Sequence, residues 1–189
     1  MTIRSTDFNH EISYIETWSQ LSYQSVIFDS NVCTWNSNDS QFHTLISNRK
    51  EIAIVIENED TTRFGCFIYA NIDTIDFSKE NNESYYSFSD PKSFIFTFYN
   101  GNPSYFGMVD EFKNDKTFTV YNPKHNSLFS IGKPLEREIS INVQGSNSKI
   151  HYPNTPFYTI TPSTVFCKKR YGDCINVKRL LVLQFGVSQ

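Results

Sequence analysis

The segment EIAIVIENEDTTRFGCFIYANI, residues 51–72, carries the clearest fold signal in the chain. Residues 51–57 place β-branched side chains between two glutamates, and residues 64–72 return with aromatic and aliphatic side chains. Between them, residues 60–63 form a short polar stretch that favours a turn. Two such apolar runs on either side of a short polar loop predict a β-hairpin.

Runs of the same kind continue through most of the chain. Phe and Tyr are abundant, with 17 and 11 copies, and both favour the half-buried surfaces of sheets. Many short strands separated by turn residues are typical of an antiparallel sandwich, and 189 residues fit a single domain. The further strands that we expect span residues 93–100, 104–112, 117–122, 127–131, 138–143, 148–152, 156–161 and 177–187. The last of these is apolar for much of its length, which predicts a central strand.

Two helices are expected before this series of strands. Apolar side chains recur at helical spacing after Asn9, which can cap a helix, and they give it one apolar face: Ile12, Ile15, Trp18 and Leu21. A second, short helix is expected to begin after Asp39 or Ser40 and to end at Asn48, with inward-facing Phe42, Leu45 and Ile46. Residues 76–90 are polar and are expected to form a surface loop. Taken together, these patterns predict a mainly β (α+β) fold, a two-sheet antiparallel β-sandwich with a few short helices at the edge.

Charge is distributed unevenly along the chain. The net charge of −3 predicts a soluble protein with little general attraction for polyanions. The last 25 residues, however, carry five basic side chains and one acidic one. The basic ones are Lys168, Lys169, Arg170, Lys178 and Arg179, with Tyr171 among them. Cations mixed with an aromatic ring could contact phosphates, so this segment is a candidate nucleic-acid or partner surface. The alternative is a solvated end of a sheet that balances the acidic remainder of the chain.

The four cysteines do not form a recognisable metal or disulfide motif. No pair has the C-x-x-C spacing, so reduced thiols are expected. Cys167 directly precedes three cations, which would lower the pKa of its thiol, and Cys174 could act as its resolving partner. These two are therefore candidate redox residues; the alternative is that both are small apolar core residues, the commonest role of buried cysteine. A metal site formed by these cysteines and His151 lacks a standard spacing.

No catalytic constellation is visible in the sequence. There is no G-x-S-x-G elbow, and His10, His43, His125 and His151 are scattered. Glu57, Glu59 and Asp60 are typical of a solvated turn beside a strand. We therefore expect a non-enzymatic protein without a cofactor. The chain also lacks an apolar signal segment and a run long enough to span a membrane, which predicts a cytoplasmic or nuclear protein without membrane insertion.

Several short motifs, in their order along the chain, resemble the TLDc domain, the family linked to oxidation resistance. The resemblance covers roughly residues 10–187 and is nearest to single-domain amoebal members. It is carried by the opening helix with Trp18, IFDSNVCTW (27–35), RFGCFI (63–68), SFIFTF (93–98) and LFSIG (128–132). Each motif alone is weak, and the ordered set is considerably stronger.

The resemblance implies an interaction module that protects against oxidative stress and binds subunits of the vacuolar proton-pumping ATPase. It also implies that Trp35 closes one end of the sandwich, with its indole over the core. The alternative is a stress-responsive regulator that binds nucleic acid through residues 168–179. Two positions depart from the family's C-terminal L-E-V-W pattern, because Val182 stands where a glutamate is usual and Gln184 where a tryptophan is usual.

Overall fold

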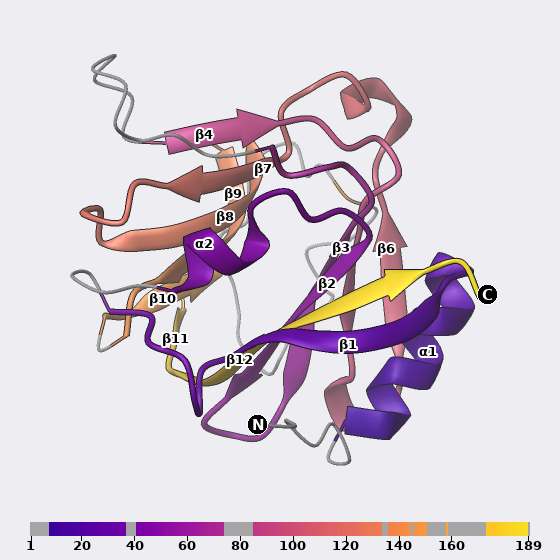
Figure 1. Ribbon diagram of the computed structural model, residues 1–189, viewed down its shortest axis with the longest axis horizontal. Helices are drawn as coiled ribbons and strands as arrows, with labels where there is room; N and C mark the ends of the chain where they lie inside the picture. Colours follow the sequence, from indigo (N-terminus) through magenta and orange to yellow (C-terminus); the bar gives the residue numbers. More distant parts are fainter. Residues whose placement is uncertain are drawn as a thin grey trace.

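Two antiparallel sheets of six strands each pack face to face in the protein (Figure 1). The computed structural model describes residues 8–36, 41–73, 85–133, 136–144, 146–150, 158 and 173–188. The predicted two-sheet antiparallel sandwich with a few short helices is confirmed. In Figure 1 the helix α1 lies on the side of the first sheet that faces away from the second sheet.

The first sheet has the strand order β1-β12-β2-β3-β5-β6. Its longest strand, β12, pairs with β1 on one side and with β2 on the other, which confirms the prediction of a central strand at the C-terminal end. The bounds of its strands are β1 Ser22–Asp29, β2 Ile52–Asn58, β3 Arg63–Ile68, β5 Phe94–Thr97, β6 Ser104–Gly107 and β12 Val177–Gly186.

The second sheet has the order β11-β10-β9-β8-β7-β4. All of its neighbouring strands pair in antiparallel fashion. Its strands are β4 Tyr85–Phe88, β7 Phe118–Tyr121, β8 Ser127–Lys133, β9 Glu136–Asn142, β10 Ser148–Ile150 and β11 Cys174–Ile175. The short 3-10 helices η2 Tyr99–Gly101 and η3 Asp110–Phe112 flank β6 on either side along the chain.

The predicted hairpin is the pair β2 and β3, in the middle of the first sheet. Every residue of β2 is buried, because both faces of this strand are covered. Ile52, Ile54 and Ile56 face the second sheet and belong to the core between the sheets, which we call the inner core. Ala53 and Val55 face the other way and belong to the outer core, between the first sheet and α1. The continuous apolar run of the sequence is thus a strand buried on both faces.

The first helix, α1 (Asn9–Ser19), covers the outer face of the first sheet. Its side chains Ile12 and Ile15 are buried there, as the apolar spacing predicts. Trp18 and Leu21 pack half-buried against the same outer core. The predicted N-cap is wrong by one position, since Phe8 is the cap residue, makes no side-chain cap bond, and Asn9 is the first helical residue.

The second helix, α2 (Phe42–Ile46), contributes to the inner core near the end of β1. Phe42 stacks on Phe129 of the second sheet and meets Phe28 of the first sheet edge-on, so the helix links the two sheets. The indole of Trp35 is also buried in the inner core, with 5% of the residue exposed. The resemblance implied that this indole lies over the core, and it packs within the inner core.

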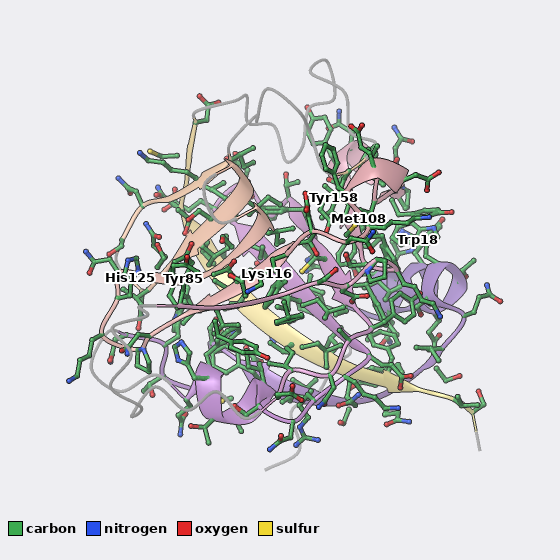
Figure 2. The ribbon with its side chains drawn as sticks, turned by 90° about the horizontal axis from the view of Figure 1, so that it is seen from above. Trp18, Tyr85, Met108, Lys116, His125 and Tyr158 are labelled. Carbon is green, nitrogen blue, oxygen red and sulfur yellow. The ribbon has the colours of Figure 1, made fainter. Side chains whose placement is uncertain are left out.

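Two predictions about the ends and loops need correction, and a third lies mostly outside the described residues. The helix α2 ends at Ile46 rather than at Asn48, which has a positive φ of 58°. The expected loop at residues 76–90 contains strand β4, whose Ser87 and Phe88 pair with β7. Of the expected strand at 156–161, only Tyr158 is described, and it forms a single bridge with Met108, beside which it lies in Figure 2. No helix in the described ranges is long and apolar enough to cross a membrane.

Candidate functional site

Six charged side chains gather around the ring of Phe8, where the start of α1 meets one end of the first sheet. The carboxylates come from α1, the end of β1 and the end of β2, and the cations come from the starts of β3 and β12. We call this group the charged cluster: Glu11, Asp29, Glu57, Arg63, Lys178 and Arg179. Its formal charges cancel, with three carboxylates against three cations.

The pair of Asp29 and Arg179 is the most enclosed part of the charged cluster. The guanidinium donates from Nε to Oδ1 at 3.0 Å and from Nη2 to Oδ2 at 2.7 Å. Burial alone would raise the pKa of Asp29, but the hydrogen bonds from Arg179 and from the Asn31 backbone, together with the charge of Arg179, outweigh it. The pKa of Asp29 therefore lies below its ordinary value, and the carboxylate stays ionised.

Arg63 joins α1 to the central hairpin. Its Nη1 donates to Glu11 Oε1 at 2.7 Å and its Nε to Glu57 Oε2 at 2.9 Å. Burial would lower the pKa of Arg63, and the bonds and charges of the two glutamates raise it above its ordinary value instead. The second oxygen of Glu11 is buried and has no hydrogen-bond partner.

The ring of Phe8 is the apolar centre of the charged cluster. The guanidinium carbon of Arg63 lies 4.0 Å from the ring centroid and that of Arg179 lies 4.9 Å from it. Phe8 itself is only 1% exposed. Both guanidinium groups therefore combine their ion pairs with a cation–π contact, which holds the start of α1 onto the sheet.

Two of the five cations in the predicted basic surface are in the described part of the chain. Arg179 is bound to Asp29, as above, and Lys178 lies 3.2 Å from Glu57 Oε1 with about half of its side chain exposed. Lys168, Lys169 and Arg170 lie outside the described residues. The carboxylate partners of Arg179 and Lys178, Asp29 at the end of β1 and Glu57 near the end of β2, are more than 100 residues away in the sequence. The sequence of the basic segment alone could therefore not predict these ion pairs.

The two candidate redox cysteines are placed only in part. Cys174 is an exposed free thiol on β11, at the edge of the second sheet, whereas Cys167 lies outside the described residues. Cys66 is completely buried in the inner core, and burial first, then the charge of Asp90, raises the pKa of its thiol. Cys174 is therefore the most exposed of the described cysteines, since Cys33 is partly buried and Cys66 is buried.

A group of aromatic side chains on the outer face of the first sheet was not singled out from the sequence. It consists of Tyr14 and Trp18 on α1, Phe98 after β5, and Tyr105 on β6, and we call it the aromatic surface. Trp18 stacks on Phe98 at 5.7 Å between ring centroids and lies 5.4 Å from Tyr105. The sequence placed Trp18 on the apolar face of its helix, but its meeting with strands 80 residues further on is a property of the fold.

The two departures from the TLDc pattern both lie on β12. Val182 is completely buried in the inner core, so a glutamate at this position would need a partner between the sheets. The side-chain amide of Gln184 donates to the carbonyl oxygens of Lys50 at 2.7 Å and Phe185 at 2.9 Å. Gln184 thus ties the end of β12 to the residues that precede β2.

Two further searches concern a possible metal site in the described residues and similarity to known proteins. Within the described ranges, no three His, Cys, Asp or Glu side chains lie close enough together to hold a metal ion. A scan of the chain against models of protein families gives no match, and no curated protein matches it either.

Proposed function

We propose that the chain is a non-enzymatic interaction module of the TLDc type that acts in protection against oxidative stress. One observation carries the proposal: the motifs behind the resemblance fall on core elements of a two-sheet sandwich, the fold that the resemblance implies. The segment 63–68 is β3, 93–98 contains β5, and 128–132 lies within β8. The helix with Trp18 is α1.

The partner that we propose is the vacuolar proton-pumping ATPase, through its subunits. Val182 is buried and Gln184 is engaged with neighbouring carbonyl groups, so contact with a partner must use other side chains than these two. The thiol of Cys174 is exposed, so an oxidant can reach it from solvent. In this proposal oxidants act on the Cys174 thiol, and the protein binds its partner without itself turning over peroxide.

A nucleic-acid-binding regulator remains the second hypothesis from the sequence, and no described contact favours it. Arg179 would have to leave a carboxylate that is itself buried in order to bind a phosphate. Removing one partner of such a pair leaves an uncompensated buried charge, which is costly. We therefore favour a protein partner over a phosphate backbone.

The proposal is tested by comparing cells that lack the protein with cells that carry it, after exposure to peroxide. We expect lower survival without the protein and full rescue by the wild-type chain. The purified protein should not consume peroxide. Equal survival of both cell lines, or peroxide turnover that is lost in Cys174→Ser, would contradict a non-enzymatic protective role.

A further inference from the structure

The edge of the second sheet places an amine directly opposite the exposed thiol of Cys174. In the register of β10 and β11, which lie side by side in Figure 1, Cys174 pairs with Lys149 and Ile175 pairs with Ser148. Ile150 and Ile175 belong to the inner core, and successive side chains of a strand point to opposite faces of the sheet. Lys149 and Cys174 therefore share the outer face of the second sheet, and both are exposed.

The pair of Lys149 and Cys174 is of the closer of the two kinds that alternate along an antiparallel ladder. The backbone N–H of Ile150 donates to the carbonyl oxygen of Asp173 at 3.3 Å, so Ile150 and Asp173 form a hydrogen-bonded pair. Such pairs alternate with pairs that exchange no backbone hydrogen bonds, in which the Cα atoms are only about 4.5 Å apart. Lys149 and Cys174 hold such a position, so their side chains leave the sheet side by side.

Among the described residues, other contacts do not compete for these two side chains. Lys149 forms no ion pair there, and its neighbour on the other side, in β9, is the neutral Ser140. The other described thiols face elsewhere, since Cys66 is completely buried in the inner core and Cys33 packs against that core. In the described part of the chain, the Lys149 amine is therefore the nucleophile that the register brings to the Cys174 sulfur.

We propose that the oxidised thiol of Cys174 links covalently to the Lys149 amine and thereby joins the edge strand β11 to β10. The inference rests on the proposed action of oxidants on Cys174 and names the group with which the oxidised thiol reacts. A sulfenic acid condenses with a nearby thiol or nitrogen, and the neighbour in register here is a nitrogen. Because β11 has only two residues, a covalent link holds it to the sheet far more firmly than its own backbone pairing does.

The reaction uses one hydrogen peroxide for each chain. The thiolate sulfur of Cys174 attacks a peroxide oxygen, the O–O bond breaks, and a sulfenic acid forms while the second oxygen takes up a proton and leaves as water. The neutral amine of Lys149 then attacks the sulfur, so that an S–N bond forms, the S–O bond breaks, and the hydroxyl leaves as water with a proton from the nitrogen. Sulfur is oxidised by two electrons and peroxide is reduced by two. The reaction ends there, because the linked sulfur is no longer a thiol, and it is therefore not turnover of peroxide.

The test exposes the purified full chain, without any partner, to hydrogen peroxide and maps the products of the monomer fraction by tandem mass spectrometry. We expect peptides that contain Lys149 and Cys174 to be joined, with a summed mass lower by about 2 Da, and to separate in dithiothreitol. Lys149→Arg should yield no joined peptides and should leave a Cys174 sulfenic acid that dimedone traps, because the amine is gone while the positive charge remains. The matched control is Lys124→Arg, at an exposed lysine between β7 and β8, which should form the link as the wild type does.

The other outcomes separate this inference from the proposed function on which it rests. A disulfide from Cys174 to Cys167 or Cys33, or a Cys174 that becomes a sulfinic acid without joining Lys149, would overturn the link and leave the action of oxidants on Cys174 in place. Joined peptides that persist in Lys149→Arg would overturn the link as well. A Cys174 thiol that peroxide leaves unmodified would contradict both the link and the proposed action of oxidants on this residue.

Discussion

Arg179 binds both carboxylate oxygens of Asp29, across 150 residues of sequence, at 3.0 and 2.7 Å. The pair connects the start of β12 to the end of β1 at the place where Phe8 begins the docking of α1. Side chains at the two ends of the chain thus close one end of the first sheet. A buried bidentate pair of this kind fixes one register for its strands and tolerates the loss of neither partner.

We expect Arg179→Gln to destabilise the protein by about 3–5 kcal/mol, because it leaves the Asp29 carboxylate buried without its cation. The double variant with Asp29→Asn should recover part of this loss. The measurement is the free energy of unfolding in urea. Lys178→Gln is the control, with an expected cost within about 1 kcal/mol, since that lysine is half exposed. If Arg179→Gln and Lys178→Gln lower the free energy of unfolding equally, the buried Asp29–Arg179 pair does not have the stabilising role that we assign to it.

Gly65 should not tolerate even one added methyl group. A Cβ atom built at this position would lie 1.8 Å from the carbonyl oxygen of Ile54, a backbone atom of the neighbouring strand. We expect Gly65→Ala to destabilise the fold by more than about 3 kcal/mol, since the central hairpin would have to separate. Gly107→Ala, where an added Cβ meets nothing within 4 Å, is the control. Thermal unfolding of the two variants distinguishes them, and similar melting temperatures would refute the steric account.

His43 should make the protein less stable in mild acid. Burial lowers the pKa of His43 below its ordinary value of about 6.5, and the bond from its Nε2 to the Tyr121 carbonyl only partly offsets this effect. As the pH falls below about 6.5, His43 becomes protonated in the unfolded chain but stays neutral in the folded chain, where its pKa is lower. Because the unfolded state then binds more protons, the free energy of unfolding decreases.

Urea unfolding at about pH 7.5 and about pH 5.5 measures this effect. His43→Gln keeps a donor for the Tyr121 carbonyl but cannot be protonated, so it should reduce the difference between the two conditions. Replacement of the exposed His10 by Gln should leave the wild-type difference in place. If His43→Gln retains the full difference, the pH dependence arises elsewhere.

Cys174 and Cys66 should differ sharply in reactivity. Cys174 is exposed, while Cys66 is completely buried with a raised thiol pKa, so a thiol-alkylating reagent should label only the former in the folded protein. Mass spectrometry of the digested protein gives the labelled fraction at each site. In urea both should react, which controls for reagent access. Labelling of Cys66 at the rate of Cys174 under native conditions would show that the inner core opens.

Local patterns in the sequence were sufficient for both helices and for most of the strands, and insufficient for β1, β4 and β11 and for the sites. The run at 51–57 indicated a strand because it is rich in β-branched side chains. The strand it forms, β2, is buried on both faces, which explains why the run does not alternate with polar residues. Strand β4 was missed because it is only four residues long and directly follows a polar stretch of sequence, and it gains its stability from pairing with β7. The charged cluster and the aromatic surface join residues that only the topology brings together, such as Trp18 and Tyr105.

The most direct test of the proposed function is the capture of partners with the tagged protein from its native cells. The capture is done with and without peroxide, and each sample is repeated after nuclease treatment. Our account predicts subunits of the vacuolar proton-pumping ATPase in samples with and without nuclease. Recovery of chromatin, or loss of all partners on nuclease treatment, would contradict it and favour the nucleic-acid-binding regulator.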